Sequence, residues 1–130
     1  MWIAKIKLKH ECIIGNRCKQ FNVILQSYDL NEEMIGKKVQ TSSLHQMIGQ
    51  EENIKKFISD LKKDKRTKYI EVNENTLFLI ESAKNKPVSH FTKKTFFVKP
   101  VVIETNGYEY WEIASHQRKE LNLFINKVKP

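Results

Sequence analysis

The stretch Glu51–Lys63, EENIKKFISDLKK, decides the fold because the chain uses its pattern twice. Its apolar residues recur at i, i+3, i+4 and i+7, on one stripe of an amphipathic helix: Ile54, Phe57, Ile58 and Leu61. Near the end of the chain RKELNLFINKVK repeats this spacing, each position 67 residues later, with Leu121, Phe124, Ile125 and Val128. The Phe-Ile dipeptide shared by both stripes favours a duplicated unit.

Composition indicates a folded globular protein of one domain or two small ones. The 130 residues are 40% hydrophobic and 10% aromatic, which suffices for a packed core. The formal charge of +8 suits a polyanionic partner, although most lysines are scattered and only Lys62–Arg66, KKDKR, is a compact run. Apolar runs are too short for a membrane span and no signal-peptide pattern precedes the first strand, so the sequence predicts a cytoplasmic protein without membrane contact.

Alternating side chains predict a half-buried strand at the start of the chain. In Met1–Lys9 the even positions are apolar, whereas Lys5 and Lys7 lie on the other side. Gly15-Asn16 is expected to turn the chain into a second strand, Phe21–Tyr28. Residues 29–37 are then expected to be a polar loop that closes a hairpin with Lys38–Met47.

Two more hairpins are predicted, one after the first helical stripe and one before the second. Strands 68–72 and 76–82 complete the first unit. Residues 96–113 form a hairpin about Asn106-Gly107, the strongest two-residue turn signal in the chain. Pro100 belongs on an edge strand or at a bulge, and Ser115 is a candidate N-cap for the second helix.

The expected fold is α+β, with an antiparallel sheet covered by one helix in a ferredoxin-like or ACT-like sandwich. The first unit spans residues 1–82, a linker follows at 83–94, and the second, incomplete unit spans 95–130. Because no strands follow the second helix, either the second unit uses the first unit's sheet or the chain is the front part of a longer protein. An unfinished second sheet predicts an open edge beside Pro100, and with it either self-association as a homodimer or an exposed apolar patch around residues 96–113.

Several segments together suggest a family: KHECIIGNRCKQFNV at 9–23, EENIKKFI at 51–58, and FFVKPVVIETNGYEYWEIAS at 96–115 leading into RKELNLFI. They resemble the N-terminal region of archaeal transcription regulators related to the bacterio-opsin activator. In that family a sensory or ligand-binding region precedes a C-terminal helix-turn-helix that contacts DNA. The resemblance implies a regulatory input domain that receives a small-molecule or protein signal. DNA would be contacted only through a C-terminal segment missing here, because no helix-turn-helix follows Lys129.

Unusual chemistry concentrates at His10, Cys12 and Cys18, with His45 as a further candidate ligand. Positions 10 and 12 share a strand face, and a turn at Gly15 would return Cys18 to the same place. Thiolate and imidazole together suit zinc or another borderline metal, which would make the protein a metal sensor, and two nearby thiols would suit a redox sensor. Ordinary core packing is the favoured interpretation, because free cysteines are among the most buried residues and a Cys-x5-Cys spacing is wider than common zinc knuckles.

Two further candidates concern binding. The basic side chains Lys62, Lys63, Lys65 and Arg66 could contact nucleic acid, and a small basic nucleic-acid-binding protein is the alternative function, although the same residues suit the C-terminus of a helix. Tyr108, Tyr110 and Trp111 could line a pocket, but the favoured interpretation places Trp111 in the core and leaves the tyrosines half-exposed, because adjacent positions on a strand face opposite sides. The sequence has no Ser-His-Asp set, recognisable carboxylate pair, P-loop or dinucleotide fingerprint, so no enzyme is predicted.

Overall fold

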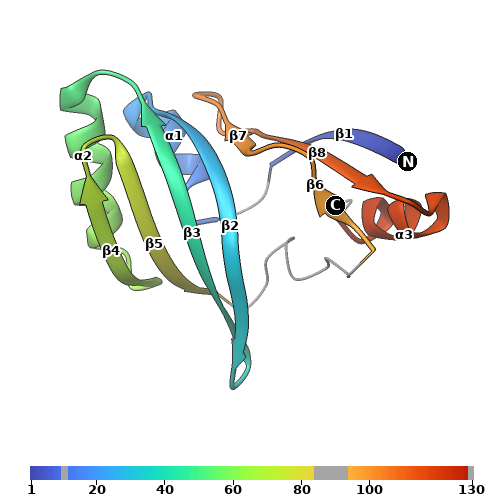
Figure 1. Ribbon diagram of the computed structural model, residues 1–130. Helices are drawn as coiled ribbons and strands as arrows, with labels where there is room; N and C mark the ends of the chain where they lie inside the picture. Colours follow the sequence, from blue (N-terminus) through green and yellow to red (C-terminus); the bar gives the residue numbers. More distant parts are fainter. Residues whose placement is uncertain (10–11, 84–93, 129–130) are drawn as a thin grey trace.

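The computed structural model describes residues 1–9, 12–83 and 94–128 (Figure 1). Within these ranges eight strands form one sheet: β1 (Trp2–Leu8), β2 (Ile24–Ile35), β3 (Lys38–Ile48), β4 (Thr67–Asn73), β5 (Thr76–Ala83), β6 (Phe96–Phe97), β7 (Val101–Ile103) and β8 (Glu109–Ser115). The helices in the same ranges are α1 (Gly15–Phe21), α2 (Glu51–Lys62) and α3 (Arg118–Val128). The predicted α+β class with an antiparallel sheet is confirmed.

The sheet combines strands from both halves of the chain. Its order is β1-β8-β7-β2-β3-β5-β4, with antiparallel pairs throughout, and β6 pairs with the end of β8. The second unit therefore shares a sheet with the first unit, which is one of the two alternatives that the sequence left open. Pro100 lies between β6, which among the described strands pairs only with β8, and β7, which pairs with both β2 and β8. An unpaired strand edge beside Pro100 is therefore limited to the two residues of β6.

The duplicated pattern corresponds to two similar hairpin and helix arrangements. Hairpin β2–β3 leads into α2, hairpin β7–β8 leads into α3, and the helices begin 67 residues apart, at Glu51 and Arg118. Phe57 and Phe124 are 0% and 2% exposed at matching positions. The two hairpins meet where β2 pairs with β7, and β1 holds on β8 the place that β5 holds on β3. The N-terminal strand thus extends the second unit's part of the sheet.

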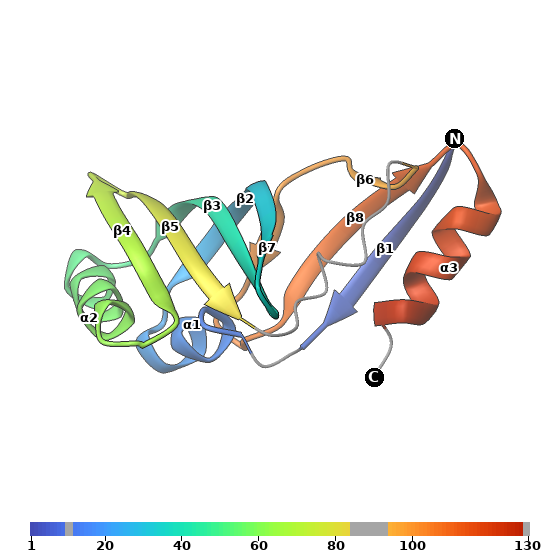
Figure 2. The same ribbon diagram turned by 90° about the horizontal axis from the view of Figure 1, so that it is seen from below.

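One hydrophobic core lies between the helices and the sheet and includes residues from both halves of the chain. Figure 2 shows α1 and α2 together on one side of β2 to β5. The Trp111 ring contacts Phe97 and Phe124, at centroid distances of 5.3 and 6.1 Å, and so connects β8 to α3. The expected single covering helix is wrong, because strands lie about 4.8 Å apart and one helix, about 10 Å wide, cannot cover eight of them.

Two local predictions before β3 are wrong. Gly15–Phe21 forms helix α1, although the sequence predicted a turn at Gly15-Asn16 and a strand from Phe21. The helix ends where Asn22 takes the left-handed conformation, with a φ of 57°. Its sequence, GNRCKQF, has too few apolar positions to show a helical period. The expected loop 29–37 is mostly strand, because β2 and β3 continue to a short turn at Gly36 (φ 64°). Residues 28–38 are all exposed, so this part of the sequence shows no alternation between buried and exposed positions.

The second hairpin has the turn that the sequence predicts. The Asn106-Gly107 turn is confirmed, since the Gly107 N–H donates to the Glu104 carbonyl at 2.9 Å and Gly107 has a φ of 84°. Pro100 lies in the break between β6 and β7, as expected for a bulge. Ser115 is the last residue of β8, and its hydroxyl accepts a hydrogen bond from the Gln117 N–H just before α3. The predicted linker lies mostly at 84–93, outside the described residues.

Candidate functional site

The sheet has one face that none of the described helices covers. On β8 the buried Trp111 and Ile113 point toward the helices, so Tyr110 and Glu112 point to the open face. Cross-strand pairing connects this face from one edge of the sheet to the other, along the row Asn73, Thr76, Gln46, Gln26, Val102, Tyr110 and Lys7. The side chains of this row are uncharged on strands β4, β5, β3 and β2, whereas the side chain on β1 is basic.

Strands β1 and β8 bring lysines and tyrosines together on this open face. Lys7 pairs in register with Tyr110, and its Nζ lies 4.5 Å from the centroid of the Tyr108 ring and 5.9 Å from that of Tyr110. The Lys9 Nζ lies 5.7 Å from the Tyr108 ring. These are cation–π distances. We define the lysine–tyrosine surface as Lys5, Lys7, Lys9, Lys99, Tyr108 and Tyr110.

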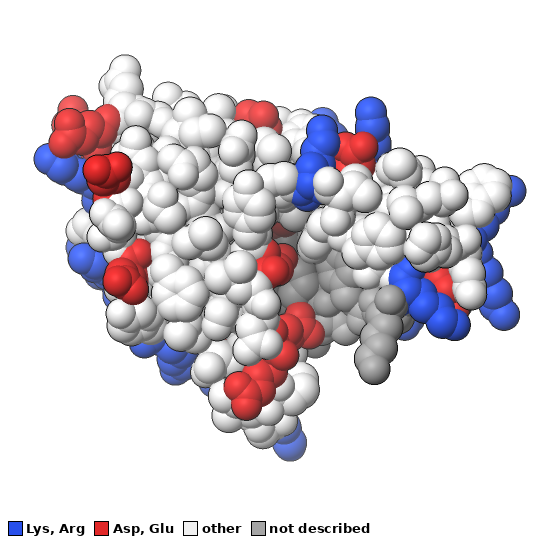
Figure 3. Space-filling model, in the orientation of Figure 1, with Lys and Arg blue, Asp and Glu red and all other residues white. Residues whose placement is uncertain are grey.

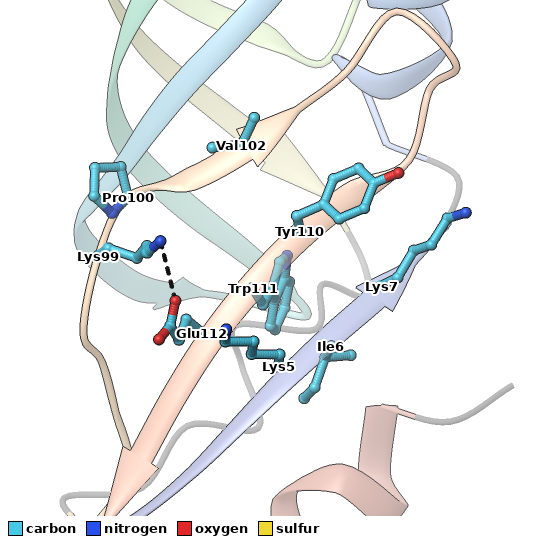
Figure 4. A pocket seen from close by; sticks show the side chains of 9 residues that line it. All are labelled: Lys5, Ile6, Lys7, Lys99, Pro100, Val102, Tyr110, Trp111 and Glu112. Carbon is cyan, nitrogen blue, oxygen red and sulfur yellow. Dashed lines mark ion pairs between the residues drawn. The ribbon is translucent and has the colours of Figure 1, made fainter.

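A hollow of about 280 Å³ lies in this surface (Figure 4). It is lined by Lys5, Ile6, Lys7, Lys99, Pro100, Val102, Tyr110, Trp111 and Glu112. Figure 4 shows Lys99 reaching from the loop before β7 toward Glu112 on β8, and the Lys99 Nζ lies 3.2 Å from the Glu112 carboxylate. Among the described residues no acidic side chain forms an ion pair with Lys5 or Lys7. The hollow therefore carries a positive charge beside an aromatic ring.

This arrangement suits a ligand that combines an anionic group with a planar ring. Lysine ammonium groups bind phosphate or carboxylate as point charges, and the face of a tyrosine accepts a stacked ring. Lys5, Lys7 and Lys9 follow one another along one side of the chain, about 6.7 Å apart for two residues of strand.

The structure describes three of the four predicted ligands of the His/Cys site, since His10 lies outside the described residues. Cys18 is fully buried on α1, and Cys12, just before α1, accepts a hydrogen bond from the Gly15 N–H at 3.2 Å. Burial, followed by the charge of Glu109, raises the pKa of Cys12 to about 12. Burial also raises the pKa of Cys18, and Cys12 adds to this rise. Because metals and disulfides react with thiolate, these environments support packing over a metal site or thiol switch.

His45 lies on β3 among serines. Its Nδ1 is 2.6 Å from the Ser27 Oγ and its Nε2 is 2.8 Å from the Ser43 Oγ, and the ring is 3% exposed. Ser27 is its cross-strand partner, so the sheet register fixes this contact. Over the described ranges no group of three or more His, Cys, Asp or Glu side chains is placed to hold a metal ion. Zinc remains a prediction.

In the basic run at the end of α2, Lys62–Arg66, the arginine makes contacts within the protein and the lysines are exposed to solvent. Arg66 donates to both oxygens of Asp64, at 3.0 and 2.8 Å, and Arg17 from α1 lies 3.0 Å from the same carboxylate. Hydrogen bonds from Arg66 hold the pKa of Asp64 well below its usual range. Arg17 thus connects α1 to the end of α2 through Asp60 and Asp64, and Arg66 holds the Asp64 carboxylate that it binds. The other three members of the predicted nucleic-acid site are exposed: Lys62, Lys63 and Lys65.

Sequence reasoning identified part of the lysine–tyrosine surface. Trp111 is in the core as predicted, 3% exposed, and Tyr110 is 36% exposed, in line with the favoured interpretation; the less favoured interpretation, that these side chains line a pocket, matches the lining of the hollow by both Tyr110 and Trp111. Lys5 and Lys7 were overlooked because alternating lysines are the ordinary polar side of a half-buried strand. Only the pairing of β1 with β8 places them beside the tyrosines, and nothing in the local sequence specifies that pairing.

Comparison of the chain with protein-family models, curated proteins and solved structures finds no match. The resemblance to archaeal transcription regulators therefore remains a prediction. Within the part of the chain that the structure describes, no helix is both long and apolar enough to cross a membrane.

Proposed function

We propose that this chain is a regulatory input module that binds a small anionic ligand with a planar ring on the lysine–tyrosine surface. The supporting observation is the register pair Lys7 and Tyr110, which sets a cation beside an aromatic ring at the edge of the hollow. The volume of about 280 Å³ is near the lower end of small-ligand pockets, roughly 300 to 1,000 Å³. A ligand of mononucleotide size fits this description.

The regulatory part of the proposal comes from the sequence resemblance. In the archaeal regulators an input region precedes a helix-turn-helix, so the ligand signal would pass to a DNA-binding segment outside these 130 residues. The module would be cytoplasmic and non-enzymatic, and its first unit ferredoxin-like or ACT-like. The open face offers the ligand a site that the helices do not block.

Binding of single-stranded nucleic acid is the second candidate. The lysines continue beyond the hollow to Lys9, beside the Tyr108 ring, so the surface is longer than one small ligand needs. Single-strand binders combine a basic track with stacking aromatic rings in this way. The two candidates differ in the length of the bound anion and in the dependence of binding on salt.

Titrations with adenosine 5′-monophosphate and with an oligothymidylate of about ten nucleotides, each at low and high salt, separate the candidates. The test variant is Lys5→Gln with Lys7→Gln. The matched control is Lys62→Gln with Lys63→Gln, which removes the same charge from the basic run after α2. Tyr110→Ala tests the ring without any change of charge.

The input-module proposal predicts saturable binding of the mononucleotide that weakens at least tenfold in the test variant and in Tyr110→Ala, but not in the control. The second candidate predicts that the oligonucleotide binds far more tightly, and that the test variant reduces its salt slope by roughly 1.4, or about 0.7 for each lysine. Equal weakening in test and control variants would indicate non-specific attraction to a basic protein and would contradict both candidates.

A further inference from the structure

We infer that two copies of this chain pack face to face through the open side of β2, β3, β5 and β4. This part of the open face contains rings and aliphatic side chains at its centre. Tyr28 pairs across to Leu44, and Leu44 to Phe78, while Ile80 pairs with Tyr69 in the next row. Tyr28 and Tyr69 are 47% and 48% exposed. Figure 3 shows the region as a broad area without charge, with acidic and basic side chains at its margins.

The absence of charge is unusual for this molecule. Charged residues make up 29% of the sequence, with a net charge of +8. Five successive cross-strand rows on the described open face, from Ile24 and Ile48 to Gln40 and Ser82, include only two charged side chains. These are Glu71 on the edge strand β4 and Glu33 on the outer part of the hairpin, both at the margin. A solvated face of such a protein would carry more charge.

A second copy is the occupant that this pattern fits. In a two-fold dimer the same surface lies on both sides, so a charged patch would meet its own charge. Glutamine amides and serine or threonine hydroxyls both donate and accept hydrogen bonds, so rows containing Gln26, Gln46 and Thr76 can pair with themselves. A partner with an acidic surface would find no lysine in the central rows.

The size of the face is sufficient for such a dimer. Four strands span about 19 Å, and the residues of β3 from Gln40 to Ile48 span about 26 Å. The product is roughly 500 Å² for each copy and about 1,000 Å² for both, the lower limit for a specific interface. The lysine–tyrosine surface lies beyond β2 on the same side of the sheet, at the margin of this contact.

Sedimentation of the full chain, with Leu44→Lys as the test variant, examines this inference. Leu44 is half-buried at the centre of the face, so a lysine there would place like charges between the two copies. The matched control is Leu123→Lys, because Leu123 is 46% exposed on α3, on the helical side of the sheet. Circular dichroism and thermal unfolding of both variants establish that each is folded.

We expect the wild type and Leu123→Lys to sediment as dimers at tens of micromolar, and folded Leu44→Lys to sediment as a monomer with a dimer dissociation constant at least tenfold weaker. Added salt should leave the wild-type dimer intact, because its interface has no ion pairs to screen. A monomeric wild type would overturn the inference and would leave the face to a different partner. A dimer that survives in folded Leu44→Lys, or that dissociates in high salt, would equally overturn it.

Discussion

Phe57 on α2 and Phe124 on α3 provide a paired test of the duplicated architecture. They lie 67 residues apart and are 0% and 2% exposed. Replacement of either ring by alanine removes buried apolar surface and leaves a cavity, which costs about 3 to 5 kcal/mol in free energy of unfolding. The Phe124 ring also lies 6.1 Å from the Trp111 ring, so Phe124→Ala should cost at least as much as Phe57→Ala.

Urea unfolding followed by circular dichroism and by tryptophan fluorescence measures both variants. With a slope of about 2 kcal/mol per molar urea, the losses correspond to midpoint shifts of roughly 1.5 to 2.5 M. Leu123→Ala is the control, since Leu123 is exposed on α3 and its loss should stay within about 0.5 kcal/mol.

Because one sheet and one core include both units, the two probes should report a single transition in the wild type. A large loss in Phe57→Ala with almost none in Phe124→Ala would refute the equivalence of the two helices. Separate transitions, with the fluorescence of Trp2 and Trp111 changing at a different urea concentration from the dichroism of the sheet, would refute the shared core.

Two further predictions follow from local structure. Gly107→Ala should lower the free energy of unfolding by at least about 1 kcal/mol, because residue 107 has a φ of 84° and an added Cβ would lie 3.3 Å from the Gly15 carbonyl oxygen. Gly36→Ala is the control and should cost less, since Gly36 has a φ of 64° but open space around it. Equal losses by calorimetry would contradict the close approach of α1 to the β7–β8 turn. Cys12 in the native protein should react with iodoacetamide at pH 8 far more slowly than in urea, and rapid alkylation of the native protein would contradict its buried environment. The pKa of Cys12 rises from 9.0 to about 12 on folding, so between these pH values the folded state keeps a proton that the unfolded state loses. The free energy of unfolding should therefore fall as the pH rises through this range.

The sequence predicts elements whose side chains alternate between core and solvent. Helices α2 and α3, strand β1 and the turn at Asn106-Gly107 all have such patterns and were predicted near their observed positions. Helix α1 was missed because it buries only Gly15 and Cys18, and a glycine followed by an asparagine is also a turn signal. The outer part of β2 was missed because every residue from 28 to 38 is exposed, which leaves no hydrophobic period to detect.

Long-range pairing explains most of what could not be predicted about the candidate site. The lysines of β1 and the tyrosines near β8 come from opposite ends of the chain, and hydrophobic periodicity specifies which face a side chain takes without specifying the neighbouring strand. The cysteines were correctly placed in or near the core by their residue type. Their raised pKa values depend on burial beside Glu109, which is far from them in the sequence.

Binding at the lysine–tyrosine surface is the central claim, and an NMR titration of backbone amides with adenosine 5′-monophosphate tests it most directly. We predict saturable shift changes around Lys5 and Lys7 on β1 and around Tyr110 on β8, with the amides of the helices unaffected. The same changes should be absent in Lys5→Gln with Lys7→Gln. Shift changes centred on Lys62 to Arg66, or none at millimolar nucleotide, would contradict the claim.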